Sequence, residues 1–235
     1  MLPRVLFFAL LFALLAGAYT DESLTVTIQL NPDGTARVFE KTIFNLDNEQ
    51  EEAAFDYALG LGETTLLDWS RFSKNIHYHL RSSQNLRITA KREFDIRFTA
   101  ASVILQYDTG VITSFEAEGR KTNYVFDPEI LVFSRSQTSE ITLGNGESLL
   151  IELPAGADAT RYLPEPSSFE NRKLVWQGPL SGAMALEFTV EKSLSQEVNE
   201  FFVSTFDELR SSYVWLLVAV FVIIAGVKLL QVTKE

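Results

Sequence analysis

The chain is apolar at both ends and polar in between, and this pattern constrains its topology more than any other feature. Residues 1–18 read MLPRVLFFALLFALLAGA, with one early positive charge at Arg4 and small residues at the exit, Ala16 to Ala18. This pattern is typical of a signal peptide that is cleaved before Tyr19. The apolar run is too short for a bilayer core, which needs about 20 residues. An uncleaved N-terminal anchor is the less favoured alternative.

The second apolar segment, residues 213–230, predicts a transmembrane helix. Tyr213 and Trp215 are expected at the outer membrane interface, where aromatic side chains gather, and Lys228 at the inner one. The positive charges of Lys228 and Lys234 place the tail, residues 231–235, in the cytoplasm. We therefore expect a single-pass type I protein of the cell membrane, with an extracellular N-terminal domain. A buried core helix is the alternative.

Residues 193–212 are expected to form a juxtamembrane helix that continues into the span. Apolar residues recur there at helical spacing, every three or four positions. This apolar stripe, Leu194–Leu209, could pack on the ectodomain, lie along the bilayer or contact a protein partner. The residues that form it are Leu194, Val198, Phe202, Phe206 and Leu209.

The region between the two apolar ends, residues 19–192, predicts a β structure. Apolar residues alternate with polar ones from Leu24 to Leu30 and again from Ala36 to Phe44, which indicates strands with one buried face. The turn sequence Asn31-Pro32-Asp33-Gly34 lies between them, because proline and glycine suit their positions in a tight turn. These residues predict a β-hairpin.

Two further hairpins are expected, one between segments 102–107 and 111–116 and one between segments 140–143 and 148–153. Shorter β-rich runs are expected at 86–98, 124–126, 130–133, 173–176 and 183–190, and helices at 48–59 and 63–72, the first capped by Asp47 or Asn48. Closely spaced turns favour a mainly β fold with an antiparallel β-sandwich ectodomain. It could be one large sandwich or two small ones, with a subdivision near residue 127.

Composition excludes several kinds of chemistry. The chain has no cysteine, so its extracytoplasmic part cannot depend on disulfides or thiol chemistry. The formal net charge is −11; leaving out Arg4, Lys228, Lys234 and Glu235 gives −13 for residues 19–212. Nucleic-acid binding depends on cationic contacts, so this charge argues against a nucleic-acid partner.

No catalytic constellation is evident, and we expect neither an enzyme nor a cofactor. His77 and His79 are the only histidines. In a strand they would face the same way and could share a metal. No regular third ligand accompanies them, so we favour an edge or surface pair over a metal site.

Charge is segregated in the first half of the ectodomain. Seven acidic residues and no basic residue lie between Thr42 and Ser70. Six basic residues and no acidic residue follow, namely Arg71, Lys74, Arg81, Arg87, Lys91 and Arg92. The two segments could neutralise each other within the fold, which is the interpretation we favour. Alternatively, the bases form a patch for an anionic glycan, lipid head group or acidic protein partner.

The later part of the ectodomain carries a recurring pattern of prolines and glycines. It runs from Leu153 to Ala157 (LPAGA), from Leu163 to Pro166 (LPEP) and from Leu174 to Pro179 (LVWQGP). This pattern, with the opening hairpin, resembles uncharacterised archaeal surface proteins that have a signal peptide, a β-rich ectodomain and one C-terminal span. It is more distantly similar to ribophorin-like luminal domains. The resemblance implies no catalytic residues.

These observations favour a membrane-anchored extracytoplasmic protein that binds or scaffolds other components, as a subunit or accessory of an envelope complex. The alternative is an envelope hydrolase or glycan-processing accessory with a site built from Asp and Glu residues. A cleft with converging carboxylates would favour the alternative.

Overall fold

The computed structural model describes residues 22–93, 99–133 and 140–191, and these are mainly β. The opening hairpin is confirmed. Strand β1 (Glu22–Leu30) pairs antiparallel with β2 (Ala36–Asn45), and Leu30 lies opposite Ala36. In the turn, Gly34 has a φ of +84°, and a Cβ there would lie 2.9 Å from the carbonyl oxygen of Thr113. Glycine is needed on both counts.

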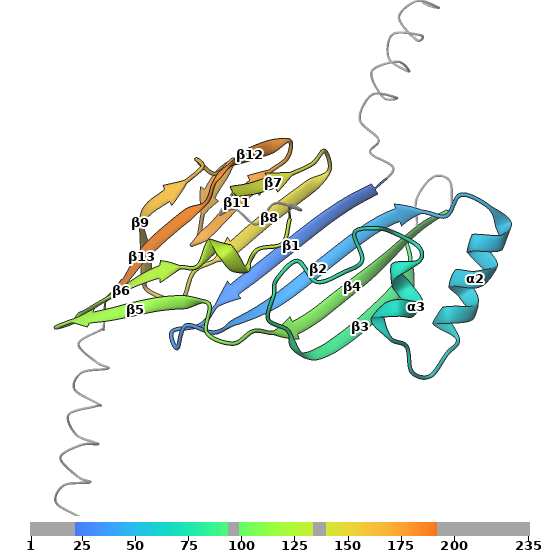
Figure 1. Ribbon diagram of the computed structural model, residues 1–235, viewed down its shortest axis with the longest axis horizontal. Coiled ribbons are helices and arrows are strands. Elements are labelled where there is room, and N and C mark those ends of the chain that lie inside the picture. Colours follow the sequence, from blue (N-terminus) through green and yellow to red (C-terminus); the bar gives the residue numbers. More distant parts are fainter. Residues whose placement is uncertain (1–21, 94–98, 134–139, 192–235) are drawn as a thin grey trace, which may run out of the picture. The chain divides into compact units, whose positions relative to one another are not determined.

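This hairpin is the centre of a seven-stranded sheet with the order β10-β11-β8-β1-β2-β4-β3 (Figure 1). The pair β1–β8 is parallel and the other pairs are antiparallel, so the sheet is mixed rather than antiparallel throughout. Strands from both sides of residue 127 are therefore neighbours in one sheet. The other strands are β3 (Gln84–Arg92), β4 (Ala100–Asp108), β8 (Glu147–Glu152), β10 (Ser168–Glu170) and β11 (Lys173–Gln177).

Two smaller sheets are present in the described part of the chain. One has the order β5-β6-β13-β9 and the other pairs β12 with β7. The bounds are β5 (Thr113–Glu118), β6 (Lys121–Phe126), β7 (Glu140–Leu143), β9 (Ala157–Leu163), β12 (Leu180–Ala183) and β13 (Ala185–Glu191). Strands β9, β10 and most of β12 were not expected. The run expected at 130–133 is not a strand: Ile130 ends a 3-10 helix, η1 (Pro128–Ile130), and Leu131 forms an isolated bridge with Leu80.

The second and third predicted hairpins are wrong. Segment 102–107 lies in β4, which pairs with β2 and β3, whereas β5 pairs with β6. The backbone N–H groups of Thr109 and Ile112 donate to the carbonyl oxygens of Ala36 and Gly34. The segment between β4 and β5 is therefore bonded to the first hairpin and does not form the turn of a second one. Likewise β7 pairs with β12, and β8 lies between β1 and β11.

Both helices lie near the predicted positions. Helix α2 (Glu49–Leu59) begins after Asn48, whose side chain accepts from the N–H groups of Gln50 and Glu51 and caps the helix. Helix α3 (Leu66–Ser70) is shorter than expected. Both pack on the end of β2 through an aromatic cluster, in which the Phe55 ring lies 6.0 Å from Phe44, 5.3 Å from Trp69 and 5.3 Å from Phe72.

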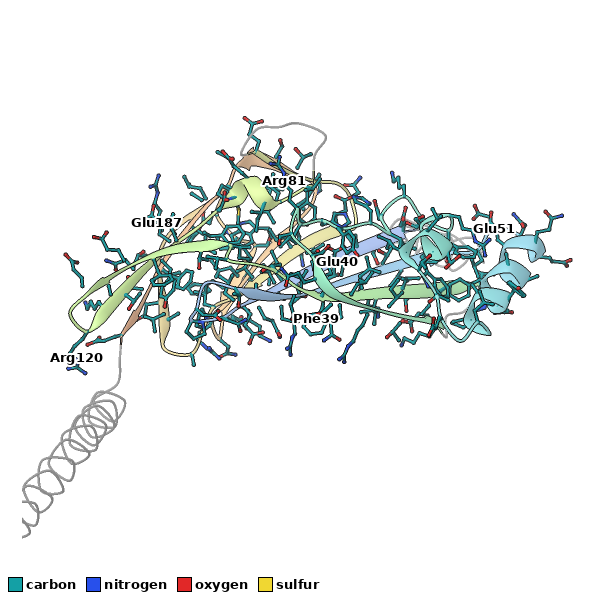
Figure 2. All side chains as sticks on the ribbon, turned by 60° about the horizontal axis from the view of Figure 1, so that its bottom comes forward. Phe39, Glu40, Glu51, Arg81, Arg120 and Glu187 are labelled. Atoms are coloured by element: carbon teal, nitrogen blue, oxygen red, sulfur yellow. The ribbon has the colours of Figure 1, made fainter. Side chains whose placement is uncertain are left out.

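Alternation along the strands gives the seven-stranded sheet two different faces. Its inner face carries Leu24, Val26, Ile28 and Val38, which are fully buried. Trp176 on β11 is also fully buried, and its indole N–H donates to the carbonyl oxygen of Pro164 at 2.8 Å. The outer face, which we define by Arg37, Phe39, Lys41, Arg87, Lys91, Gln106 and Asp108, carries longer and more polar side chains. Figure 2 shows Phe39 and Glu40 on opposite faces.

Among the described residues, no helix has both the length and the apolar character that a membrane span requires. The predicted signal peptide (1–18), juxtamembrane helix with its stripe Leu194–Leu209, span (213–230) and tail lie outside the described residues. The same applies to the membrane-interface residues Tyr213, Trp215 and Lys228. These predictions remain predictions.

Candidate functional site

A hollow of about 430 Å³ lies on the outer face where β3, β4 and β2 run side by side. A β-bulge shapes it: Gln84 pairs with Asp108 and Arg87 with Gln106, so β3 advances three residues where β4 advances two. Asn85, in the bulge, has a φ of 56°, a left-handed conformation that asparagine tolerates better than most residues. The hollow is lined by Arg37, Asn85, Leu86, Arg87, Gln106, Tyr107 and Asp108.

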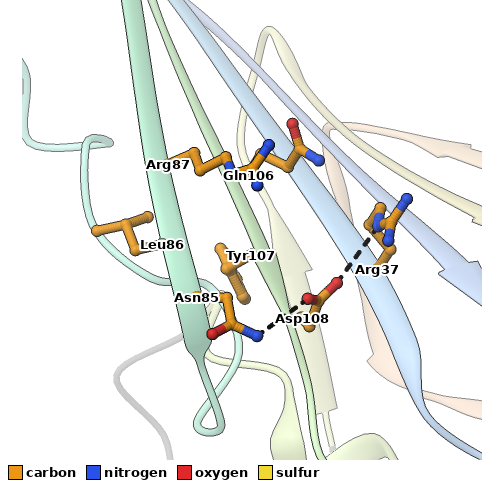
Figure 3. Close-up of a pocket in the computed structure, with 7 residues that line it drawn as sticks. All are labelled: Arg37, Asn85, Leu86, Arg87, Gln106, Tyr107 and Asp108. Atoms are coloured by element: carbon orange, nitrogen blue, oxygen red, sulfur yellow. Dashed lines mark hydrogen bonds and ion pairs between the residues drawn. The ribbon is translucent and has the colours of Figure 1, made fainter.

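The polar side chains of the hollow divide into two groups (Figure 3). Asp108 is held between Arg37, whose Nε lies 3.3 Å from its Oδ1, and Asn85, whose Nδ2 donates to its Oδ2 at 3.3 Å. Arg87 and Gln106 lie opposite each other across β3 and β4. Among the described residues, neither of these two side chains has a hydrogen-bond or ion-pair partner. The hollow therefore offers a guanidinium and an amide that are free to bind a ligand.

Farther along the outer face, cations are already paired. Lys41 and Lys91 each lie 3.2 Å from a carboxylate oxygen of Glu93. Burial opposes ionisation of Glu93, but hydrogen bonds from Ser102, Lys91 and Lys41 outweigh it and lower the pKa of its carboxyl group. These lysines have a partner in the fold, and Arg87 does not have one among the described residues.

The structure brings only some of the six predicted basic residues together. Arg87 and Lys91 share the outer face of β3, as their even spacing requires. Arg92 points to the opposite face, where its Nε lies 2.9 Å from Asp56 and its Nη2 lies 3.5 Å from Glu52. These ion pairs join the basic residue Arg92 to two residues of the acidic segment between Thr42 and Ser70. Such contacts are what neutralisation of one segment by the other requires.

The other three basic residues lie in the irregular segment between α3 and β3. The Arg71 guanidinium lies 4.8 Å from the centre of the Phe72 ring. Lys74 and Arg81 are exposed, and the backbone N–H of Arg81 donates to the carbonyl oxygen of Ile130 at 3.0 Å. Figure 2 shows Arg81 away from Phe39, which lies on the outer face. The six residues thus do not form one continuous patch in the described part of the chain.

A buried polar cluster on the inner face was missed by the sequence analysis. Glu40, His79 and Tyr107 are each at most 3% exposed. Glu40 accepts from the backbone N–H of His79 at 2.8 Å, lies 2.9 Å from His79 Nδ1 and accepts a hydrogen bond from the Tyr107 hydroxyl. Burial and the Glu40 carboxylate raise the pKa of Tyr107 far above its usual range, so the phenol stays protonated. In the alternating pattern of β2, Glu40 occupies an inward-facing position between Val38 and Thr42. This position was the sequence signal that could have revealed a buried carboxylate.

The polar side chains of the hollow are mostly hydrogen-bond donors. Asp108 is the one carboxylate among its seven lining residues, and Arg37 and Asn85 hold it. Hydrolysis of a glycosidic bond ordinarily uses two carboxylates that flank the bond. The hollow instead presents donors from a guanidinium and amides, which suit an anionic oxygen group.

Comparison with known proteins gives little further information. No family model matches the chain, and no curated protein matches it. The folded domain of the LppM protein of Mycobacterium tuberculosis, determined by NMR, is similar at 9% sequence identity and a TM-score of 0.35. The match covers 75% of this chain and 93% of that domain. Values this low carry no conclusion about fold or function, and the resemblance to archaeal surface proteins stays a prediction.

Proposed function

We propose that this protein is a membrane-anchored extracytoplasmic binding or scaffolding subunit of an envelope complex. Its hollow on the outer face holds an anionic oxygen group of the partner. The signal peptide and the span expected from the sequence supply the location. In this proposal the β sheets form a sandwich ectodomain, and the juxtamembrane helix continues into the span.

The observation that carries the proposal is the pair of unoccupied donors, Arg87 and Gln106, in an acidic chain. A guanidinium presents its N–H groups in a planar fork that matches a carboxylate or a phosphate group. A hydrogen bond to a charged group contributes about 1.5–3 kcal/mol. One such contact gives selectivity within a larger interface and does not alone supply high affinity.

The test is charge reversal on the outer face. Arg87→Glu places a carboxylate in the hollow, where the partner's anionic group would lie, and Lys91→Glu adds a second carboxylate farther along the same face. Gentle detergent extraction followed by crosslinking of the wild type should recover a stoichiometric partner, and the double variant should recover at least tenfold less of it. Recovery from the wild type should fall as salt is raised, because the contact is partly exposed.

A matched control is the pair Lys74→Glu and Arg81→Glu, which changes the charge equally but lies outside the hollow. This control should retain the partner. The proposal would be contradicted if a well-folded Arg87→Glu/Lys91→Glu protein recovered as much partner as the wild type. It would also be contradicted if the extracted wild type were a monomer without a stoichiometric partner.

A further inference from the structure

His77 and His79 lie side by side in the irregular segment between α3 and β3, rather than in a strand as the sequence suggested. The centres of their rings are 4.2 Å apart and the ring planes are inclined at 34°. His79 is buried, whereas His77 is at the surface. The pair therefore joins a buried ring to a ring at the surface.

Each ring has the same nitrogen engaged. His79 Nδ1 lies 2.9 Å from the buried carboxylate of Glu40, and His77 Nδ1 lies 2.9 Å from the backbone carbonyl oxygen of Lys74. A carbonyl oxygen can only accept, so His77 Nδ1 is the donor, and His79 Nδ1–H likewise donates a hydrogen bond to the Glu40 carboxylate. In neutral rings, this leaves the lone pair on both Nε2 atoms.

Neither Nε2 has a hydrogen-bond partner within the described ranges 22–93, 99–133 and 140–191. A histidine that binds a metal almost always donates its other ring N–H to a carboxylate or a backbone carbonyl, which fixes the tautomer and the ring orientation. Here both kinds of support occur, one on each ring.

We propose that His77 and His79 form a two-imidazole site for a divalent first-row transition-metal ion, Cu²⁺ or Zn²⁺, bound through the two Nε2 atoms. Imidazole suits these ions, and hard cations such as Mg²⁺ prefer oxygen ligands. With metal–nitrogen bonds of about 2.0–2.1 Å, two tetrahedral ligand nitrogens lie about 3.3 Å apart. The ring centroids lie 4.2 Å apart, which brings the two imidazoles close enough to share one ion.

The direction of the pKa shift of His77 agrees with this assignment. Partial burial lowers the pKa of His77, and the neighbouring His79 adds to the effect. The neutral imidazole is the form that binds metals. Within the described residues, no group of three or more His, Cys, Asp or Glu side chains is placed to hold a metal. The remaining coordination positions thus belong to water or to a ligand from outside, as in sites that keep an open position.

The chain allows a clean test, because it contains two histidines and no cysteine. The full-length protein, purified in detergent without a histidine tag, is titrated with Zn²⁺ and with Cu²⁺ by calorimetry. We expect one ion per chain, at least tenfold weaker binding in His77→Gln, and no competition by excess Mg²⁺. The electron paramagnetic resonance spectrum of the Cu²⁺ complex should show couplings to two imidazole nitrogens.

His77→Gln is the main variant because its ring is at the surface, whereas His79 supports the buried Glu40. Tyr78→Phe is the matched control, since it lies between the histidines and keeps both imidazoles, and it should bind as the wild type does. Equal binding by His77→Gln, full competition by Mg²⁺, or a Cu²⁺ spectrum without nitrogen couplings overturns the proposal, because each indicates surface carboxylates. Absence of binding to the wild type overturns it as well.

Discussion

At the scale of single residues, Glu40 is a carboxylate buried in the core of the described region. Burying an isolated charge is costly unless it is paired and hydrogen-bonded. Glu40 meets this condition through His79 and Tyr107, two residues distant in the sequence that the fold brings to the same face of β2. Removing one of these donors leaves part of the buried carboxylate unsatisfied.

We predict that Tyr107→Phe lowers the free energy of unfolding by about 1–3 kcal/mol, the usual cost of leaving a buried polar group unpaired. Urea unfolding at pH 7 measures the change. Tyr78→Phe is the control: its ring lies 5.2 Å from that of Tyr107, but no hydrogen bond of its hydroxyl is present among the described residues. It should change stability by less than about 0.5 kcal/mol. Equal stability of both variants would show that Glu40 does not depend on the Tyr107 hydroxyl.

The sequence contained part of this information. Alternation predicted which residues of β2 share the inner face, and the same alternation places Glu40 among them. It could not identify the partners, because His79 and Tyr107 come from an irregular segment and from β4. The hollow was even harder to predict from the sequence, because it depends on a bulge at Asn85. No local signal distinguishes that asparagine from one in an ordinary turn.

At the level of elements, turn chemistry predicted where the chain reverses but not which strands become neighbours. The first hairpin and helix α2 follow from local patterns, and both are confirmed. The predicted second and third hairpins were wrong because β4 and β8 pair with other strands in the seven-stranded sheet, β4 with β2 and β3, and β8 with β1 and β11. Thr25 and Ser148, on the parallel pair β1–β8, are hydrogen-bonded across 123 positions of sequence, a separation at which local propensity carries no information.

The link between α2 and β3 has a pH dependence of known sign. Asp56 accepts from Arg92 Nε at 2.9 Å and Nη2 at 3.1 Å, and the hydrogen bonding from Arg92 lowers the pKa of Asp56. A carboxyl group with a lowered pKa in the folded state stabilises the fold above its unfolded pKa, near 4. That contribution is lost as the pH falls through the lower folded value.

We therefore predict that Asp56→Asn is less stable than the wild type at pH 7 by a few tenths of a kcal/mol, because Asp56 is exposed and the pair is screened by solvent. The difference should shrink steadily below about pH 4. Urea unfolding at steps from pH 7 to pH 2 measures it. Glu116→Gln, at an exposed position on β5 without a partner among the described residues, should show no such trend. A constant difference for Asp56→Asn at all pH values would contradict the assignment.

At the scale of the whole molecule, the open question was whether the ectodomain is one folding unit or two joined near residue 127. The seven-stranded sheet places β8, β10 and β11 beside β1, β2, β3 and β4. Leu105 on β4 and Leu174 on β11 are buried in one hydrophobic cluster, although they come from opposite sides of residue 127. A core shared in this way predicts cooperative unfolding.

We predict that Leu105→Ala and Leu174→Ala each lower the free energy of unfolding by about 2–5 kcal/mol. Both should shift the same single transition in urea, because the two leucines belong to one core. Tryptophan fluorescence and far-UV circular dichroism of the full chain in detergent follow the transition. The buried Trp69 and Trp176 report on the parts before and after residue 127. If the chain instead had two independent units, each variant would shift one of two phases and leave the other in place, and the two probes would no longer coincide.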